Sequence, residues 1–162
     1  MRFLIQRVLE GQVAAETPGG GKAISGRIGP GLVVLVGFGS GDGPGLPGTR
    51  AWRAMIDKLL QVRIFSDDKG KMNLSLEDAG GGLLLVSQFT LYANCRRGRR
   101  PGFDDAAPPD TARTLYERLV EELRGRLGER LQCGVFGAYM EVSLVNWGPV
   151  TLFWDSDELF GA

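Results

Sequence analysis

The sequence predicts one domain of the α/β (α+β) class, with a mixed sheet that curls toward a barrel and two main helices. Nine short apolar or alternating segments are typical of strands, and two longer segments show helical periodicity. No linker or internal repeat divides the 162 residues, a length that suits one domain of ordinary size. We therefore expect residues 1–162 to form a single domain.

The N-terminal segment is predicted to contain four strands separated by glycine- and proline-containing turns. Residues 32–36 are apolar throughout, which predicts a central strand that is covered on both faces. A Gly/Pro-rich connection at 39–48 then leads to the first helix. The four expected strands are residues 2–8, 12–15, 23–28 and 32–38.

Two segments have the spacing of amphipathic helices. In the first, one apolar stripe is formed by Trp52, Met55, Ile56, Leu59 and Leu60. In the second, Pro108-Pro109-Asp110 supplies start signals, and the apolar face runs on to Leu127. The remaining expected strands are residues 63–65, 83–86, 131–136, 140–146 and 150–154.

The composition excludes several kinds of active site. There is no histidine, which removes Ser-His-Asp and Cys-His nucleophile systems, a histidine general base and every histidine-based metal site. Nineteen basic residues balance nineteen acidic ones, so bulk charge does not drive binding. Cys95 and Cys133 are too few for a disulfide scaffold or a cysteine-rich metal site, and we expect reduced thiols. We therefore expect no metal and no cofactor.

The hydropathy pattern predicts a soluble, cytoplasmic protein. No apolar run approaches the ~18 residues that a membrane span needs. The N-terminal residues become charged before the core of a signal peptide could form. No membrane partner is expected.

One glycine-rich segment and two carboxylate pairs have ordinary structural interpretations. The segment 37–43 follows a strand but lacks the third glycine of a dinucleotide fingerprint and the Lys-Ser/Thr of a P-loop, so we expect a flexible connection. Asp67-Asp68 and Asp104-Asp105 are adjacent carboxylates, and adjacent residues on a strand point to opposite faces. Both pairs are expected to be solvated turns.

A single dense basic cluster is formed by Arg96, Arg97, Arg99 and Arg100. One interpretation is a solvated loop. The other is a patch that contacts phosphates, because guanidinium groups match phosphate oxygens. A neutral protein with one basic loop would contact a nucleic acid locally without coating a duplex, so no DNA partner is expected.

Two polar motifs interrupt apolar segments. Ser87-Gln88-Phe89-Thr90-Leu91 ends a predicted strand, where its hydroxyl and amide groups are either satisfied within the fold or bind a ligand. Asn146-Trp147-Gly148-Pro149-Val150-Thr151 joins two strand-like segments, which is typical of a hairpin turn. The sequence alone leaves the Gly148–Pro149 bond open as cis or trans.

Together, these two motifs resemble the signature pair of the D-aminoacyl-tRNA deacylases, once called D-tyrosyl-tRNA deacylases. The likeness covers almost the whole chain. It includes Ile5-Gln6-Arg7-Val8, Arg63-Ile64-Phe65, Gly70-Lys71-Met72-Asn73-Leu74, Arg99-Arg100-Pro101, Phe136-Gly137-Ala138 and Val142-Ser143-Leu144-Val145-Asn146.

The resemblance implies a homodimer that hydrolyses the ester between a D-amino acid and the 3′-terminal adenosine of tRNA, a proofreading reaction that recycles mischarged tRNA. Gly148-Pro149 would be a Gly-cisPro dipeptide that reaches into the partner subunit's site. Its carbonyls would face the chiral centre of the substrate and exclude an L side chain, so selectivity would rest on rejection. Glycine has no side chain to reject, so glycyl-tRNA is expected as a second substrate.

The resemblance also assigns residues to the site. Ser87, Gln88, Phe89 and Thr90 would hold the aminoacyl group and the terminal ribose, with Gln88, Phe89 and Thr90 as the catalytic segment. A small residue, Ala112, would line the pocket, and Phe136 and Met140 would line its adenosine end. For these last three residues, core packing is the alternative interpretation.

Three positions depart from the usual pattern of the family. Trp147 stands where an acidic residue is common, Tyr139 replaces a frequent Asp, and Cys95 replaces a frequent Thr. The position of Trp147 is variable in the family, so the assignment holds. Tyr139 lies between pocket positions and is expected to alter the contacts with adenosine.

Two mechanisms and two rival functions follow. In the first mechanism, Thr90 acts as a nucleophile. This mechanism requires an activating base, and the sequence does not place one beside Thr90. Alternatively, the ribose 2′-OH assists attack by water while main-chain N–H groups near Phe89 and Thr90 stabilise the oxyanion, and we favour this route. The rival functions are a relative with a trans Gly-Pro bond that acts on mischarged L-alanyl-tRNA, and a non-catalytic RNA-binding module that rests on the arginine cluster.

Overall fold

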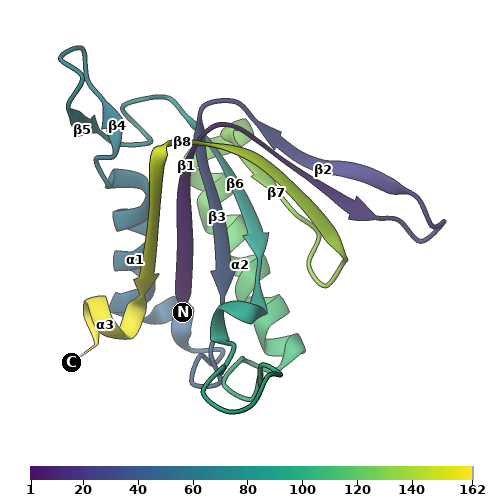
Figure 1. The fold of residues 1–162 in the computed structure, drawn as a ribbon. Helices are drawn as coiled ribbons and strands as arrows, with labels where there is room; N and C mark the ends of the chain where they lie inside the picture. The colour runs from purple at the N-terminus through teal and green to yellow at the C-terminus, as the bar shows by residue number, and fades with distance from the viewer. Residues whose placement is uncertain (162) are drawn as a thin grey trace.

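A curled sheet of six strands forms the centre of the computed structural model, which describes residues 1–161 (Figure 1). A separate two-stranded ribbon lies beyond the first helix. The strands of the large sheet are β1 (Arg2–Glu16), β2 (Lys22–Ile28), β3 (Gly31–Gly37), β6 (Gly82–Ser87), β7 (Leu131–Cys133) and β8 (Met140–Asp155). The ribbon pairs β4 (Phe65–Ser66) with β5 (Met72–Leu74).

Pairing in the large sheet is mixed. Its strand order is β2-β1-β3-β6-β7, and β8 pairs with β1 as well. β1 is antiparallel to β2, β3 and β8, whereas β3, β6 and β7 run parallel to one another. β2 also contacts β6 and β7, so the sheet curls until it is nearly closed. The predicted fold class, a mixed barrel-like sheet with two main helices, is confirmed.

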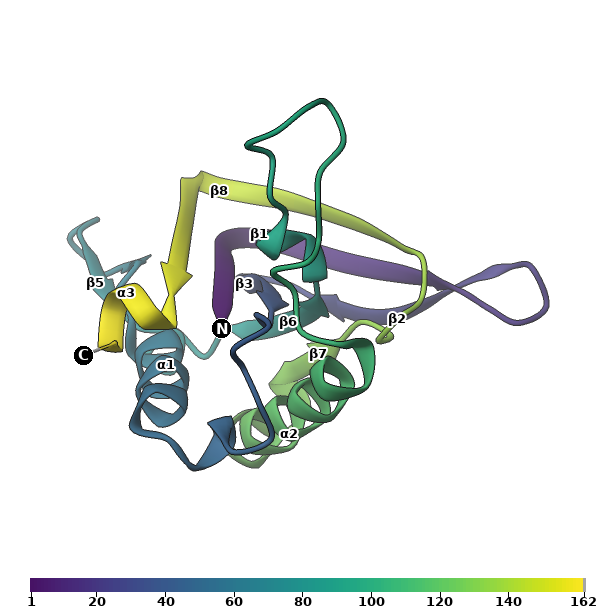
Figure 2. The ribbon, with the colours of Figure 1, turned by 90° about the horizontal axis from the view of Figure 1, so that it is seen from below.

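Both main helices lie on one side of the sheet (Figure 2). α1 (Arg50–Gln61) begins at Thr49, whose side chain accepts a hydrogen bond from the Trp52 N–H. α2 (Pro109–Leu127) begins at the predicted proline signals and ends at Gly128. A third helix, α3 (Ser156–Phe160), follows β8. Within residues 1–161, no helix is both long and apolar enough to cross a membrane.

The core forms where the helices cover the sheet. The apolar stripe predicted for α1 is wholly buried, and it packs with Leu115, Leu119 and Leu123 of α2 against the sheet. A smaller cluster fills the inside of the curl and includes Val33 and Leu84. β3 has side chains in both clusters, which confirms the prediction that this strand is covered on both faces.

The predicted number of strands was wrong because two strands are long and bent. Residues 2–8 and 12–15 belong to one strand, β1, and residues 140–146 and 150–154 belong to one strand, β8. Their pairing shifts register near Arg7 and again near Leu9, so β1 and β8 bend together without separating into hairpins. The expected hairpin turn at Gly148-Pro149 is therefore a corner within β8.

Three smaller differences concern short elements. No pattern in the sequence indicated β5, and the strand expected at 63–65 is β4, shifted toward the turn. Residues 134–136 leave the sheet and form a loop in place of the end of the expected strand at 131–136. The expected turn at Asp67-Asp68 is confirmed, because Asp67 Oδ1 accepts hydrogen bonds from the backbone N–H groups of Lys69 and Lys71.

Candidate active site

The segment that carries the first polar motif leaves the sheet at the end of β6. Ser87 pairs with Val36 as the last residue of the strand, and the N–H of Gln88 donates to the Val36 carbonyl at 2.7 Å. The chain then forms a single 3₁₀ turn, η2 (Phe89–Tyr92). Gly37 allows this turn to lie close to β3, because a Cβ at that position would stand 2.8 Å from the Gln88 carbonyl oxygen.

Arg2 holds η2 against the ends of β1 and β8. Its Nη1 donates to the Leu91 carbonyl at 3.0 Å, and its guanidinium lies 4.1 Å from the centre of the Tyr92 ring. Its Nε donates to Asp155 Oδ2 at 2.7 Å. Although burial opposes ionisation of Asp155, the hydrogen bond from Arg2 helps to lower the pKa of that carboxyl. The turn is thus fixed by a charged group 89 residues earlier in the sequence.

A cavity of about 870 Å³ opens beside η2. Its wall is formed by the ends of β3 and β6, the first turn of α2, the loop before β8 and the start of β8. The structure brings six of the predicted pocket residues together in this wall. They are Ser87, Gln88, Phe89, Ala112, Phe136 and Met140.

Thr90 does not line the cavity. Its side chain is exposed, and its Oγ1 accepts a hydrogen bond from Gln88 Nε2 at 2.6 Å. In the described residues 1–161, no lysine or carboxylate is hydrogen-bonded to this hydroxyl. A threonine nucleophile would need such a base, so the local geometry favours a supporting role for Thr90.

The main-chain N–H groups of Phe89 and Thr90 are the first two of η2. A 3₁₀ turn bonds each N–H to the carbonyl three residues earlier, and the first bond of this turn runs from the N–H of Leu91 to the carbonyl of Gln88. The two preceding N–H groups therefore have no acceptor within the turn. Phe89 lines the cavity, so the turn that carries these two donors begins at the cavity wall.

The wall of the cavity is mostly apolar. Its ionisable side chains are Asp104 and Tyr139. Asp104 is exposed, as the turn prediction required, but it also lines the cavity, which that prediction missed. Phe103, next to it, makes an edge-to-face contact with Phe89 at 5.0 Å between ring centres.

Two tyrosines pack near the site without supplying a base. The Tyr116 hydroxyl donates to the Leu85 carbonyl at 3.0 Å, and its ring lies 5.7 Å from that of Phe136. Burial raises the pKa of Tyr116 well above its usual value. Burial likewise raises the pKa of Tyr92. Both phenols therefore stay protonated at neutral pH.

The second polar motif lies outside this cavity, at the corner of β8. The Gly148–Pro149 bond is cis, the state that the resemblance implies, and both residues are exposed. Arg7 contacts the residue before Gly148. Its Nε donates to the Trp147 carbonyl at 2.9 Å, and its guanidinium lies 4.8 Å from the centre of the Trp147 ring. Arg7 also donates to the Ile64 carbonyl.

The arginine cluster lies on the segment between η2 and α2, which projects from the body of the molecule (Figure 2). Hydrogen bonds between the main chains of Asn94 and Gly102 close its base at 2.8 and 2.9 Å. All four arginine side chains are exposed, and within residues 1–161 none of them forms an ion pair.

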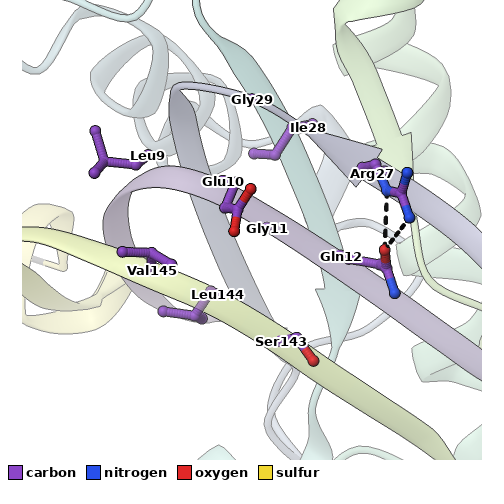
Figure 3. A pocket seen from close by; sticks show the side chains of 10 residues that line it. All are labelled: Leu9, Glu10, Gly11, Gln12, Arg27, Ile28, Gly29, Ser143, Leu144 and Val145. Atoms are coloured by element: carbon purple, nitrogen blue, oxygen red, sulfur yellow. Dashed lines mark hydrogen bonds between the residues drawn. The ribbon is translucent and has the colours of Figure 1, made fainter.

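A second hollow, of about 620 Å³, lies between β1, β2 and β8 (Figure 3). Arg27 crosses from β2 to β1, where its Nε donates to Gln12 Oε1 at 2.9 Å. None of the predicted site residues lines this hollow. Across residues 1–161, no group of three or more Cys, Asp or Glu side chains is placed to hold a metal ion.

Comparison with known proteins decides the family. The family model described as D-Tyr-tRNA(Tyr) deacylase matches residues 4–155. The chain belongs to that family. The resemblance drawn from the two polar motifs is thereby confirmed, and the motifs lie within the matched range.

Relatives in the deacylase family align along nearly their whole length. The D-aminoacyl-tRNA deacylase of Nitratidesulfovibrio vulgaris is 58% identical over 161 residues, which cover 99% of this chain and 96% of the relative. That of Thermosipho melanesiensis is 48% identical over 160 residues, covering 99% and 100%.

Two solved structures share the fold of this chain. The c-Myc DNA Unwinding Element Binding Protein superposes with a TM-score of 0.81 at 35% identity, covering 96% of this chain and 98% of that one. A structure described as a "probable eukaryotic D-amino acid tRNA deacylase" has a TM-score of 0.77 at 21% identity, covering 94% and 97%. The second likeness shows the fold.

Proposed function

We propose that this member of the deacylase family hydrolyses the ester between a D-amino acid and the 3′-terminal adenosine of tRNA. Family membership makes the chain a D-aminoacyl-tRNA deacylase, an ester hydrolase. The finer parts of the proposal are the placement of the substrate, the mechanism, the rejection of L-amino acids, the homodimer and glycyl-tRNA as a second substrate. The reaction returns mischarged tRNA to use in the cytoplasm.

The cavity beside η2 is proposed to hold the aminoacyl-adenosine end of the tRNA. Ser87, Gln88 and Phe89 would contact the aminoacyl group and the terminal ribose, and Phe136 and Met140 the adenosine. All five line one cavity, which supports this placement. Its largely apolar wall suits a ligand that is fixed by a few hydrogen bonds.

The pair of N–H groups at the start of η2 is the observation that carries the mechanism. Water attacks the ester carbonyl carbon, and the adjacent ribose 2′-OH assists the removal of a proton from that water. The N–H groups of Phe89 and Thr90 stabilise the oxyanion. The bond from the carbonyl carbon to O3′ then breaks, and O3′ takes up a proton. The products are the free D-amino acid and tRNA with an intact 3′ end.

Gly148 and Pro149 are proposed to act in the cavity of the partner subunit of a homodimer. They are exposed and do not line the cavity of their own chain, and Arg7 fixes the segment that carries them. Their carbonyls would face the substrate and exclude an L side chain. Glycine offers no side chain to exclude, so glycyl-tRNA would also be hydrolysed.

A deacylation assay with four substrates tests this function. We expect hydrolysis of D-tyrosyl-tRNA and of glycyl-tRNA, and little hydrolysis of L-tyrosyl-tRNA or of mischarged L-alanyl-tRNA. Rapid hydrolysis of L-alanyl-tRNA would favour the relative with relaxed chirality. Binding of tRNA without hydrolysis of any substrate would favour the RNA-binding module. The mass of the protein in solution tests the homodimer.

The variant Thr90→Ala is expected to retain activity within about tenfold of the parent. Removing the hydroxyl eliminates one hydrogen bond to Gln88 and leaves the two main-chain donors in place. The measurement is kcat on D-tyrosyl-tRNA, with circular dichroism as the control for folding. A decrease in kcat of several orders of magnitude in a folded variant would instead support the mechanism in which Thr90 is the nucleophile.

Neutralising Arg96, Arg97, Arg99 and Arg100 together to Ser is expected to weaken binding of tRNA and leave kcat unchanged. Every arginine–phosphate pair that the substitution removes should reduce the salt dependence of log K by about 0.7 to 0.9. Matched replacement of the exposed Arg50 and Arg53 on α1 is the control. If KM and the salt dependence of binding are unchanged, the arginine cluster is a solvated loop that does not contact phosphates.

A further inference from the structure

Two exposed side chains, Tyr139 in the cavity wall and Arg113 beside Phe136, have no role in the proposed function. Tyr139 lines the cavity, yet 82% of its surface is exposed. Arg113, near the start of α2, is also exposed. It forms no ion pair within residues 1–161. An exposed aromatic ring in the cavity wall and an unpaired cation thus lie on neighbouring segments.

The backbone that carries Tyr139 is fixed although its side chain is exposed. The carbonyl of Tyr139 accepts a hydrogen bond from the N–H of Glu16 in β1 at 3.0 Å. The preceding turn is closed by the N–H of Ala138, which donates to the Val135 carbonyl at 3.2 Å. A ring presented on an anchored backbone loses little conformational entropy when a ligand stacks on it.

Arg113 is held beside the same loop. Its guanidinium carbon lies 4.8 Å from the centre of the Phe136 ring, a cation–π contact that positions the group without neutralising it. Arg113 does not line the cavity, so Phe136 separates it from the space assigned to the terminal adenosine. A Cβ built at Gly137 would stand 3.6 Å from Arg113 Nη2, so the guanidinium lies against the loop that carries Tyr139.

We propose that Tyr139 and Arg113 bind the nucleotide that precedes the terminal adenosine, and this inference rests on the proposed function. Tyr139 stacks on the base of that nucleotide, and Arg113 pairs with the phosphate that links it to the adenosine. Unpaired bases stack on exposed aromatic rings whatever their identity. A guanidinium is the side chain best matched to a phosphate.

Substrates of increasing length separate this contact from the contacts of the adenosine itself. D-tyrosyl esters of adenosine, of the dinucleotide CpA and of full tRNA are compared by kcat/KM. The parent enzyme is expected to gain on the order of tenfold from adenosine to CpA. Tyr139→Ala should abolish most of that gain. Tyr139→Phe retains the aromatic ring, so the gain from adenosine to CpA should remain. Tyr139→Ala should lower kcat/KM much less on the adenosine ester than on the CpA ester, because the stacking contact with the preceding base exists only in the longer substrate.

Arg113→Ala supplies the second arm. It should lower kcat/KM on the CpA ester and reduce the salt dependence of binding by about 0.7, the value for one phosphate of a single strand. Arg50→Ala, on the exposed start of α1, is the matched control and should change neither.

The outcomes that overturn the inference are distinct from those that overturn the proposed function. Equal decreases on all three esters would place Tyr139 against the adenosine, and no decrease on any of them would remove the contact altogether. A parent enzyme that hydrolyses every ester without a gain from adenosine to CpA would refute the inference alone. A parent enzyme that hydrolyses none of them would refute the proposed function and the inference with it.

Discussion

A substrate that ends in 2′-deoxyadenosine is expected to be hydrolysed about a thousand-fold more slowly than its ribose counterpart. The chain has no histidine, the buried tyrosines near the cavity stay protonated, and within residues 1–161 no lysine or carboxylate is hydrogen-bonded to Thr90. Asp104 lines the cavity but lies in an exposed turn, and the proposed mechanism assigns the assistance of proton transfer to the 2′-OH, a contribution of about 10²–10⁴ in rate. The measurement is the single-turnover rate on D-tyrosyl-tRNA with either terminal nucleotide.

The uncatalysed rate must be measured beside it. A 2′-OH also accelerates spontaneous hydrolysis of the ester, so the ratio of catalysed to uncatalysed rate is the quantity to compare. A 2′-O-methyl adenosine terminus keeps the oxygen and removes its proton, which isolates the role of that proton. Undiminished turnover of the deoxy substrate would mean that the protein supplies the base, and the mechanism assigned to η2 would fail.

The substitution Gly148→Ala is expected to disrupt the rejection of L-aminoacyl-tRNA. Gly148 has φ of 129°, a region that favours glycine. A Cβ there would stand 2.7 Å from Arg7 Nη2 and 3.0 Å from Val150 Cγ2. The Arg7 side chain or Val150 must therefore shift, and a shift of about 1 Å at a positioning group is worth about 100-fold in rate. We expect the ratio of kcat/KM for D- over L-tyrosyl-tRNA to fall at least about tenfold.

The matched control is Gly125→Ala in α2. A Cβ at Gly125 meets no atom within 4 Å, so this replacement should leave the ratio unchanged and stabilise the fold by about 0.4–1 kcal/mol. Gly148→Ala should instead lower the free energy of unfolding by about 1–3 kcal/mol, measured with urea. A Gly148→Ala protein with unchanged stability and unchanged discrimination would remove this segment from the selection of D-amino acids.

Local patterns predicted the parts of the fold that local physics dictates. The stripe of α1 and the proline signals of α2 specify helices because one face of each must be buried. The apolar run of β3 specifies a covered strand for the same reason. The breaks predicted between residues 8 and 12 and between 146 and 150 are wrong, because pairing of β1 with β8 carries both strands through their bends. α3 is too short to show helical periodicity.

The same distinction applies to the site. Ser87, Gln88 and Phe89 are contiguous at the end of a strand, so a motif identifies them, and the structure places them in one wall. Phe103, Asp104 and Arg2 reach the site from other parts of the chain through tertiary contacts, and no spacing in the sequence links them to it. Tyr139 stands out in the sequence only as a departure from the family pattern, and its exposure at the mouth of the cavity required the structure.

The pairing of β1 with β8 has a consequence for how the protein folds. Arg2 and Asp155, whose ion pair helps to hold η2, are separated by 153 residues. Contacts between such distant residues slow folding, because a long loop must close before they form. Until β8 has been synthesised, β1 keeps an open edge that can pair with another chain, and Arg2 lacks its carboxylate. The turn to which the proposed mechanism assigns the oxyanion donors is therefore among the last parts of the protein to be fixed in place. Any mutation that delays the docking of β8 should lower the yield of active protein before it alters the chemistry.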